Sequence, residues 1–443
     1  MSIIRKVASA LQTALGSALD QLGRQTGVIR RQRKFTGATL LKTMVLTLLK
    51  SPAAKTDAFV ATAAQLGVTV TAKAVEDRFT DTLVGFLRAG LEHVLGHALA
   101  ADPAAIPLLD KFTAVEIADS TSVTVPDESA DEFPGCGGKS GSGKATVKLQ
   151  VAWELRTGAL TKLALQPGRH SDAKSQGPDD PVVPGSLSLR DLGDFSLERF
   201  RKVGASGAYW ISRWQQGTTV FDADGRPRDL LEYVRGHQGS GPLDEPILLG
   251  AEERLPCRLI VLRVPPEMAA RRRQKAYERA RKHGTVPGAE QLAWCEWTVF
   301  VTNCPAELLS WKEVVVLYRA RWQIELRFKL WKSHNHLATY RETWSAVERM
   351  AVFWAKLIGV VLQHWLLLTS TWSNPRRSHW KAAAVIRQWV VSLTGALDDI
   401  EALIGVLAGM TTTINAVAHK KLQSKSPSSF QLLLNPELLN WNC

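Results

Sequence analysis

The chain of 443 residues contains little cysteine, and its five cysteines form no pair at the CxxC spacing. They are scattered at Cys136, Cys257, Cys295, Cys304 and Cys443. An odd number of scattered thiols argues against a disulfide-stapled secreted domain and provides no structural zinc site. We therefore expect the protein to work in a reducing compartment.

A secretory signal and an uninterrupted membrane span are also missing from the pattern. Residues 1–23 have neither a continuous apolar core nor a clear cleavage site, so they are typical of an amphipathic helix. The longest apolar stretch begins at Met350 and contains Lys356, Gln363 and His364, which are costly inside a bilayer. We expect a buried core helix there, no membrane partner and a cytoplasmic location.

Acidic residues are outnumbered by basic ones. Lysine and arginine total 55 against 42 aspartates and glutamates, which gives a net charge of +13. This excess favours a polyanionic partner, and nucleic acid is the first candidate, because positive charge steers the approach of polyanions. A basic protein without such a partner is the alternative that charge alone leaves open.

A complete phosphate-binding loop is lacking as well. Residues 135–146, GCGGKSGSGKAT, nearly match the GxxxxGK[ST] pattern, but Ala145 stands where a hydroxyl would hold magnesium. The flanks predict a loop before the segment and a strand after it, whereas phosphate binding requires a helix N-terminus after it. We interpret the segment as a linker, and nucleotide hydrolysis is disfavoured.

The apolar pattern predicts helices up to about residue 100. The clearest helix follows Thr36 and has apolar residues at helical spacing on one face: Leu40, Leu41, Met44, Val45, Leu48 and Leu49. The basic run before it offers Arg30, Arg31 and Lys34 as candidates for DNA binding. Residues 57–79 have the outline of a helix-turn-helix, with two plain packing helices as the alternative.

From about residue 105 the pattern changes to strands with interleaved helices, which indicates an α/β layer structure. Strands are predicted within residues 112–125, 145–165, 186–190, 209–212, 246–250, 257–264 and 296–303. One of them closes on Asp119 and another on Asp191. A predicted helix at 267–283 carries seven Lys or Arg against two Glu, which favours a phosphate-facing surface over a merely solvated one.

Residues 317–332, LYRARWQIELRFKLWK, contain a single acid, Glu325, among five bases: Arg319, Arg321, Arg327, Lys329 and Lys332. At about 100° per residue, a polar row of four residues falls within roughly 60° of arc on the helix: Tyr318, Arg321, Glu325 and Lys332. An apolar edge lies beside it, formed by Leu317, Ile324, Phe328 and Trp331. An ordinary solvated helix would space its acids to pair with its bases, and this one does not.

A carboxylate among bases fits a metal ion that bridges carboxylates to phosphate oxygens. Magnesium takes hard oxygen ligands in octahedral geometry, so Glu325 alone is insufficient and further carboxylates are needed at nearby strand ends. Asp119 and Asp191 are the candidates.

The tyrosine, arginine, glutamate and lysine of this helix resemble, in type and spacing, the YREK signature of bacterial insertion-sequence transposases. The flanking RWQIELRFKLWKS is similar to the same family, and the resemblance spans about residues 25–370. The DST that begins at Asp119 and the DLGDF that begins at Asp191 resemble the family's two aspartate motifs. Asp194 stands where many relatives have an aromatic residue, and Asp191 is preferred as the ligand because it directly follows a strand.

The resemblance implies an RNase H-like core in which Asp119, Asp191 and Glu325 are catalytic and bind two Mg²⁺ ions, for which Mn²⁺ can substitute. It implies cut-and-paste transposition, in which a transposon end is nicked, closed as a hairpin, reopened and joined to target DNA. The implied partners are double-stranded DNA, as inverted-repeat ends and as target, and a second copy of the chain in a synaptic homodimer. Association with the bacterial nucleoid follows.

The resemblance also assigns DNA-binding roles. Tyr318, Arg321 and Lys332 would hold phosphates. Arg213 matches a basic residue that contacts DNA, and Trp297 matches an aromatic residue that receives a nucleobase flipped out of the duplex. A core position is the alternative for Trp297, because the chain has 15 tryptophans and Trp294 stands in the same WCEW segment. A structural role is likewise the alternative for Arg213.

The implied organisation is a helical DNA-binding domain at 1–100, a catalytic core at 101–215 and 296–372, a β-rich insertion at 216–295, and a helical region at 373–443. Two other functions stay open: a catalytically inactive, transposase-derived DNA-binding protein and a sequence-tolerant RNase H-like nuclease. The complete set of three acids disfavours the first, and a dedicated N-terminal DNA-binding region disfavours the second.

Overall fold

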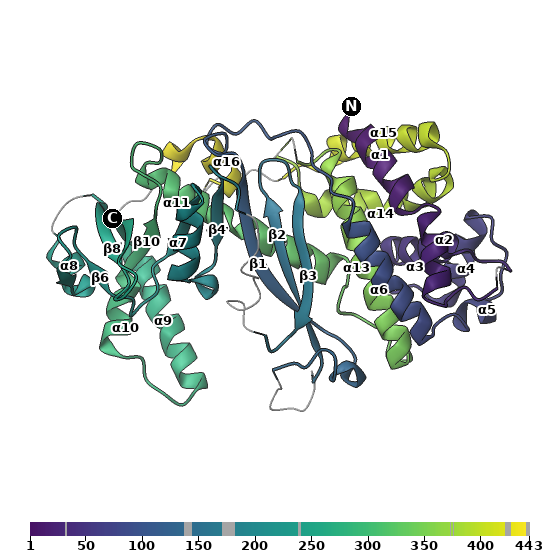
Figure 1. Ribbon diagram of the computed structural model, residues 1–443, viewed down its shortest axis with the longest axis horizontal. Coiled ribbons are helices and arrows are strands. Elements are labelled where there is room, and N and C mark those ends of the chain that lie inside the picture. Colours follow the sequence, from purple (N-terminus) through teal and green to yellow (C-terminus); the bar gives the residue numbers. More distant parts are fainter. Residues whose placement is uncertain are drawn as a thin grey trace. The chain divides into compact units, whose positions relative to one another are not determined.

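The computed structural model describes residues 1–31, 33–136, 144–170, 182–237, 241–372, 374, 376–420 and 427–439 (Figure 1). Residues 137–143, which form most of the segment that nearly matches a phosphate-binding loop, lie outside these ranges. The architecture is mixed α/β, as the sequence predicts. The chain forms two compact units, and each is described by itself.

The helical unit comprises Met1–Ala105, Ser120–Ser171 and Ile324–Leu422, and the sheet unit comprises Ile106–Asp119, Asp172–Gln323 and Gln423–Cys443. The helical unit contains α1 (Ile3–Ala14), α2 (Ala18–Gln25), α3 (Gly37–Lys50), α4 (Thr56–Gln65), α5 (Ala72–Glu76), α6 (Asp81–Leu95), α13 (Ala346–Leu368), α14 (His379–Ala396) and α15 (Ile400–Val417).

Helix α3 begins where the sequence predicts it. Thr36 is the N-cap and forms a capping box with Thr39, and the Asp20 carboxylate accepts a hydrogen bond from the Ala38 amide at 2.8 Å. The prediction of a single apolar face was too narrow, since nearly every residue of α3 is buried. The reason is that α2, α4, α13 and α14 all pack against it.

Helix α13 is the buried core helix that the sequence predicts. By length and composition, α13 and α15 could each cross a membrane, but the apolar window of α13 is completely buried within the described residues. Its polar side chains have partners: Lys356 donates to the carbonyls of His336 and Thr339 at 2.9 and 2.7 Å. Hydrogen bonding of this kind makes a buried lysine tolerable in an apolar core.

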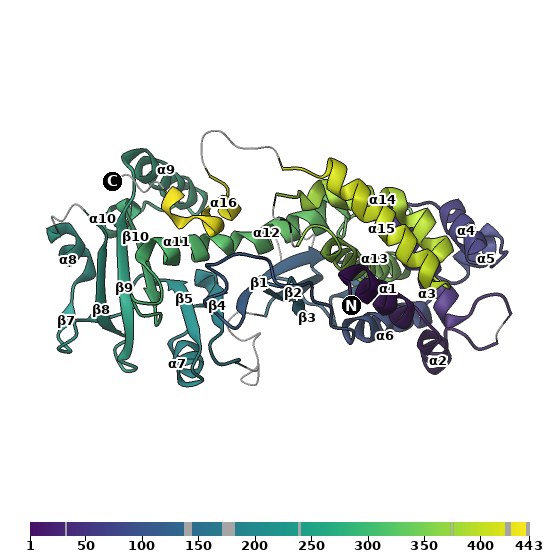
Figure 2. The ribbon, with the colours of Figure 1, turned by 90° about the horizontal axis from the view of Figure 1, so that it is seen from above.

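The two ends of the chain share this unit. Helix α15 packs against α14 and α1, as Figure 2 shows. The buried Lys42 of α3 forms an ion pair with Asp398 at 2.8 Å, and Arg5 of α1 pairs with Glu401 of α15 at 3.2 Å. The N-terminal and C-terminal helical regions therefore contribute to one core.

Helices α4 and α5 flank the turn at Gly67, whose φ of +75° favours glycine. The second helix is short, only five residues. The helix-turn-helix outline stays a prediction.

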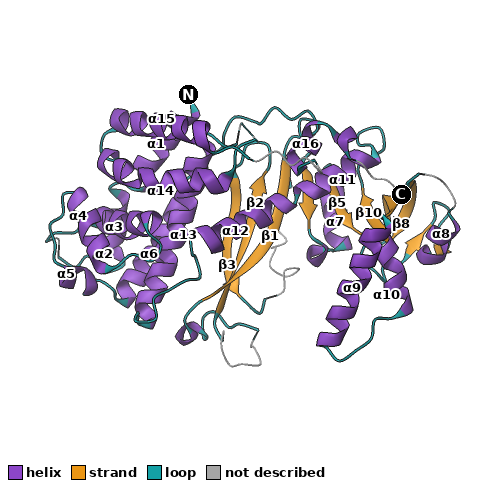
Figure 3. Cartoon of the chain, turned by 180° about the vertical axis from the view of Figure 1, so that it is seen from behind, coloured by secondary structure: helices purple, strands orange, loops and turns teal. Residues whose placement is uncertain are grey.

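Strands β2 (Thr146–Glu154) and β3 (Leu160–Pro167) form an antiparallel hairpin in the helical unit (Figure 3). Its turn includes Thr157 and Gly158, as predicted, and Gly158 has a φ of +73°. The buried Trp153 lies near the end of β2. This strand end is important for the environment of Arg327, described below.

The sheet unit contains β1, which runs Val115–Thr124 and crosses the boundary between the units, and then β4 (Leu187–Arg190), β5 (Tyr209–Arg213), β6 (Val220–Phe221), β7 (Pro227–Arg228), β8 (Leu243–Leu249), β9 (Leu255–Arg263) and β10 (Trp297–Thr302). In this unit the strand order is β1-β4-β5-β10-β9-β8-β6-β7. The pairs β1–β4 and β4–β5 are parallel, and the pairs of β10 with β5 and β9 are antiparallel.

The region predicted as a β-rich insertion contains β6 to β9 together with α8 (Leu230–Gly236), α9 (Pro266–Lys282) and α10 (Ala289–Ala293). Strand β9 pairs with β10 over six residues, so these strands extend the sheet that carries β5.

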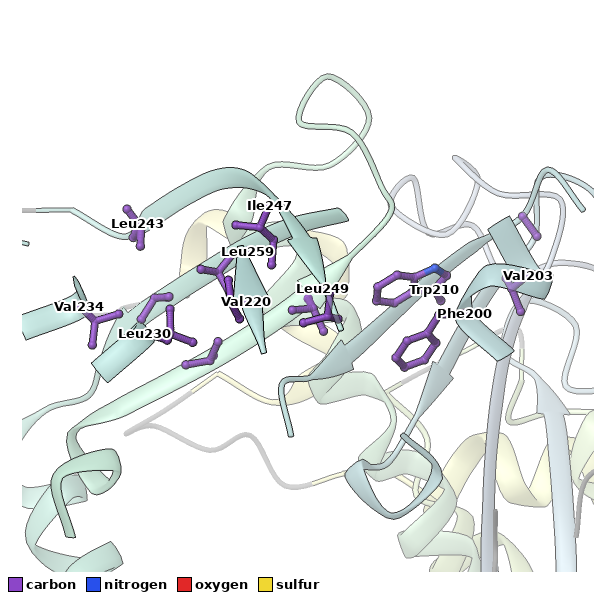
Figure 4. Packing of buried hydrophobic residues seen from close by; sticks show 14 residues of the cluster. Phe200, Val203, Trp210, Val220, Leu230, Val234, Leu243, Ile247, Leu249 and Leu259 are labelled. Atoms are coloured by element: carbon purple, nitrogen blue, oxygen red, sulfur yellow. The ribbon is translucent and has the colours of Figure 1, made fainter. Parts of the chain in front are cut away.

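The core of the sheet unit lies on one face of these strands. Phe200 of α7 (Leu197–Ala205) stacks on Trp210 of β5 with ring centroids 4.1 Å apart (Figure 4). Val299 and Val301 of β10 belong to the same cluster, together with Ile247 of β8 and Leu259 of β9. Burial of these side chains fixes the strands that carry the site.

Residues 311–334 form an almost continuous helical run in three parts: α11 (Trp311–Ala320), α12 (Trp322–Lys329) and a π-helical turn (Leu330–His334). The single regular helix assumed from the sequence was therefore wrong in detail. At Arg321 the amide bonds to the Tyr318 carbonyl, three residues back, and at Asn335 the amide bonds to the Leu330 carbonyl, five residues back. The expected apolar edge is confirmed, because Leu317, Ile324, Phe328 and Trp331 are all buried. The boundary between the two units falls within α12, after Gln323.

Candidate active site

Strand register brings two aspartates and an arginine to one level of the sheet. The β1–β4 ladder ends at the pair Ala118 and Arg190, so the next residues on the two strands are Asp119 and Asp191. The β4–β5 register, continued by two residues past its last pair, sets Arg213 level with Asp191. Neighbouring strands lie about 4.8 Å apart, so these side chains emerge side by side on one face.

Asp191 directly follows β4, as the sequence predicts. Asp119, however, lies inside β1 and not at its end, because β1 continues to Thr124. Buried Thr121 and Val123 continue its alternation of buried and exposed residues, which favours a longer strand.

Arg321 contacts both carboxylates. Its Nη1 atom lies 3.4 Å from Asp119 Oδ2, and its Nη2 atom lies 3.4 Å from Asp191 Oδ1. The arginine side chain is 11% exposed, whereas that of Asp191 is 50% exposed and open to water. One guanidinium therefore holds two acids together at the end of the parallel strands.

The structure separates Asp191 from its neighbour Asp194. The Asp194 carboxylate faces Arg190 at 3.8 Å and its side chain is only 10% exposed. Arg190 also donates to Glu116 at 3.0 Å. Asp194 therefore pairs with Arg190, whereas Asp191 pairs with Arg321.

Tyr318, Phe300 and Arg213 continue the site away from the carboxylates. The Arg321 guanidinium lies 5.8 Å from the Tyr318 ring centroid, and the Tyr318 and Phe300 rings meet edge to face at 5.2 Å. Arg213 lies 5.5 Å from the Phe300 ring centroid and donates from Nε to the Val299 carbonyl at 3.2 Å. Phe300 was not predicted; its place opposite Arg213 depends on the β5–β10 register.

The electrostatics of this group follow from its burial. Burial raises the pKa of the Tyr318 phenol to about 12, against the opposing effect of nearby Arg321. The phenol is therefore protonated at neutral pH and can donate a hydrogen bond. Burial also lowers the pKa of Arg213, and the neighbouring Tyr318 and Asp191 oppose that shift. Arginine still keeps its charge at neutral pH.

Glu325 is half-buried in the first turn of α12, four residues after Arg321. One helical turn separates these two residues along the chain. Lys332 is exposed in the π-helical turn. A π-helical turn is wider than an α-helical one, so the predicted arc of the polar row is distorted where it reaches Lys332.

Arg327 does not belong to the basic surface that the sequence suggests. It is 3% exposed, and its guanidinium lies 5.3 Å from the ring centroids of both Trp153 and Trp372. It also contacts His379 Nε2 at 3.0 Å. A signal was present in the sequence: Arg327 precedes Trp331 by one helical turn and thus adjoins the apolar edge.

Trp297 is the first residue of β10 and is half-buried. Part of it packs against the core cluster, and the Arg263 guanidinium lies 5.8 Å from its ring centroid. Trp297 therefore packs against the core and is also partly exposed to solvent.

The predicted N-terminal bases are exposed. Arg30, Arg31 and Lys34 precede α3, and Lys34 donates to the Thr69 carbonyl at 2.7 Å. This bond ties the basic run to the segment between α4 and α5.

Asp119, Asp191 and Glu325 carry the oxygen ligands that divalent cations prefer, but among the residues described they do not form a complete metal site. Within those ranges, no three His, Cys, Asp or Glu side chains form a group that could hold a metal. Asp119 and Asp191 converge instead on the Arg321 cation. Two hard-oxygen ligands that meet at a positive charge fit Mg²⁺ in type.

Comparison with known proteins gives a family match. The family described as transposase DDE domain matches residues 111–358. The transposase for insertion sequence element IS231B of Bacillus thuringiensis subsp. berliner is 28% identical over 341 residues, with 72% of this chain and 70% of the relative covered. The transposase for insertion sequence element IS231F of Bacillus thuringiensis subsp. israelensis is 25% identical, and the alignment covers 94% of this chain and 92% of the relative.

A solved structure of the piggyBac transposase synaptic complex with hairpin DNA is similar at a TM-score of 0.46 and 8% identity. The match covers 95% of this chain and 87% of that one.

Proposed function

Because the chain belongs to the transposase DDE domain family and is an insertion-sequence transposase, an enzyme that cleaves DNA and transfers strands, we propose that it moves its element by cut-and-paste. In this route the transposon end is nicked, closed as a hairpin, reopened and joined to target DNA. The observation that carries the proposal is the placement of Asp119 and Asp191 side by side where the parallel pairing of β1 and β4 ends, both in contact with Arg321.

Asp119, Asp191 and Glu325 are the residues that would hold two divalent ions, Mg²⁺ or Mn²⁺. The convergence of two carboxylates on one cation supports this assignment, and Glu325 follows one helical turn after that cation. When bound, such ions activate the attacking oxygen and stabilise the leaving oxygen in displacement at a phosphodiester.

The other residues of the site position DNA. Arg321 and Arg213 supply positive charge for phosphate oxygens, and Arg321 does so beside the two carboxylates that it contacts. Tyr318 keeps its proton at neutral pH, because burial raises its pKa to about 12, so its hydroxyl can donate a hydrogen bond to a phosphate oxygen. Lys332, exposed in the π-helical turn, adds a point charge for the backbone.

Trp297 would receive a base turned out of the duplex. Hairpin closure requires a sharply bent strand, and removal of one base from the stack lowers the steric cost of that bend. The half-buried ring at the start of β10 offers a stacking face.

The proposed core is RNase H-like, and the mixed sheet with parallel β1, β4 and β5 supports it. The proposed partners are the inverted-repeat ends, target DNA and a second copy of the chain in the synaptic complex, in the bacterial cytoplasm at the nucleoid. The N-terminal bases Arg30, Arg31 and Lys34 contribute to end binding.

Neutral isosteres of the acids test the proposal. With an end-bearing duplex and Mg²⁺, the wild-type chain should yield nicks and then hairpins, and Asp119→Asn, Asp191→Asn and Glu325→Gln should each abolish nicking while DNA binding persists. Asp194→Asn is the matched control and should cleave normally, because its carboxylate pairs with Arg190 instead.

Full nicking by any of the three variants would remove that residue from the site. Binding of ends by the wild type without any nicking would favour the inactive DNA-binding protein. Equal cutting of DNA without ends would favour the nuclease.

A further inference from the structure

Helix α9 has too little apolar surface to be held in place by packing. Of its 17 residues only Ala269 is buried. It is fastened instead by two arginines to the start of β10. Arg272 donates to the Trp297 carbonyl at 2.8 Å and to the Thr298 hydroxyl at 2.9 Å, and Arg273 pairs with Glu296.

A second set of bases on α9 faces outward. We define the α9 stripe as Arg271, Lys275, Arg279 and Lys282, which are all exposed. At about 100° per residue they lie within an arc of roughly 80° and extend along about 16 Å of helix. Within the described ranges, these four side chains form no hydrogen bond or ion pair with other residues of the chain.

The spacing of the α9 stripe is unfavourable for an isolated helix. Arg271 and Lys275, and likewise Lys275 and Arg279, are like charges at i and i+4, which destabilise a helix. The two acids of α9, Glu267 and Glu278, lie on the same side but offset only part of the charge of the four bases, and Glu278 also accepts a hydrogen bond from Gln274. A lysine or arginine in the last helical turn is explained by the helix dipole, but Arg271 and Lys275 lie well before that turn. An external anion would relieve this repulsion.

The α9 stripe adjoins the candidate site through Arg272. Arg272 is hydrogen-bonded to Trp297 and Thr298, and Arg213 donates to the carbonyl of the next residue, Val299, so the two guanidiniums bind adjacent residues of β10. Burial lowers the pKa of Arg272, and the positive charge of Arg213 lowers it further. Trp297 is the first residue of β10, the strand to which Arg272 is hydrogen-bonded. Positive charge thus continues from the site, past the proposed stacking residue, onto α9.

We propose that the α9 stripe binds the phosphate backbone of duplex DNA without reading its sequence and so extends the DNA path beyond Trp297. The inference rests on the proposed function and adds a surface to it. A helix of about 16 Å corresponds to about five base pairs, because the duplex advances 3.4 Å per base pair. A membrane does not fit the stripe, since α9 lacks a continuous apolar face to insert.

The test measures the salt dependence of binding by the full-length chain. The probe is a duplex of arbitrary sequence without transposon ends, and the variant is R271Q/K275Q/R279Q/K282Q. Each lost phosphate contact should reduce the slope of log K against log salt by about 0.9, so the four together should reduce it by up to about 3.6.

Two matched variants control for charge and for folding. R24Q/K202Q/R235Q/K381Q removes four exposed bases from α2, α7, α8 and α14, and it should retain most of the wild-type slope. R271K/R279K keeps the charge on the stripe and should bind like the wild type.

An unchanged slope in the stripe variant, or an equal loss in the dispersed control, would overturn the inference. Cleavage of end-bearing DNA distinguishes this failure from failure of the proposed function. If the wild type cuts ends and the stripe variant keeps the full slope, only the stripe inference fails and the proposed function stands.

Discussion

Two arginines six residues apart on the α11–α12 run have opposite environments. In the sheet unit, Arg321 contacts the carboxylates of Asp119 and Asp191. In the helical unit, Arg327 lies between the indoles of Trp153 and Trp372. One guanidinium balances negative charge in a partly wet site, and the other is surrounded by aromatic faces. A count of bases along a helix therefore does not tell how many can bind DNA.

The aromatic region is built from distant segments of the helical unit. Trp153 stacks on His364 at 5.5 Å, and the Nε2 atom of His364 lies 2.8 Å from the Gly158 carbonyl oxygen. Burial lowers the pKa of Arg327 to about 9. An aromatic ring stabilises such a desolvated cation by about 2 kcal/mol per contact, which offsets part of the cost of burial. Arg321, by contrast, contacts two carboxylates and lies near one ring, that of Tyr318, so function and stability should respond differently to loss of each arginine.

The largest expected effect is on catalysis, at Arg321. Arg321→Met should slow nicking by about 10²–10³-fold, because it removes a charge aimed at the site. The free energy of unfolding should fall by about 1–3 kcal/mol, because Asp191 is open to water but Arg321 and Asp119 are largely buried. Single-turnover nicking and urea unfolding measure the two effects. Arg321→Lys should rescue only part of the rate, because lysine cannot contact two carboxylates as a fork. Full nicking by Arg321→Met would show that Arg321 does not serve catalysis, and the proposed functional difference from Arg327 would be wrong.

The next effect is on stability, at Arg327. Arg327→Ala should lower the free energy of unfolding by about 3 kcal/mol, because it leaves a cavity between two indoles. Arg327→Met fills most of that volume without a buried charge and should stay within about 1 kcal/mol of the wild type. Urea unfolding compares the pair. If methionine is as damaging as alanine, the cation itself holds this region, and the volume argument is wrong.

The smallest effect is a pH dependence to which two buried histidines of the aromatic region contribute. Burial lowers the pKa of His364 from 6.5 to about 3, with a further contribution from Arg327, and burial also lowers the pKa of His379 well below 6.5. Below pH 6.5 the unfolded chain binds protons that the folded chain does not. Stability is therefore complete above that pH and falls as the pH drops, by about 1.4 kcal/mol per pH unit for each histidine.

Urea unfolding between about pH 7 and pH 6 measures this loss, which should total about 1.4 kcal/mol for the two histidines. His364→Gln preserves a donor for the Gly158 carbonyl and should remove one histidine's share of the slope. An unchanged slope would show that His364 titrates normally in the folded protein.

Local sequence patterns were sufficient to predict the elements that depend on them. Alternation predicts β1 and β4, so Asp119 and Asp191 can be proposed as neighbours from the residues alone. Thr36 predicts the start of α3, and the glycine at 158 predicts the hairpin turn. Each of these signals lies within a few residues of the feature it specifies.

Features that depend on distant contacts could not be predicted in the same way. The cage of Arg327 joins Trp153 and Trp372, which are more than 200 residues apart in the sequence. Phe300 meets Arg213 only because β10 and β5 pair in a particular register. The extra length of β1 and the π-helical turn at Lys332 arise from packing and backbone geometry that helical and strand periods do not encode.

The matched level of Asp119, Asp191 and Arg213 on three parallel strands makes the site sensitive to chain length as well as to side-chain chemistry. A strand turns successive side chains to opposite faces, so a shift of one residue would point an aspartate into the other layer. Insertions and deletions in β1, β4 or β5 should therefore disable the enzyme even when every functional residue is retained, whereas loops between these strands can vary in length.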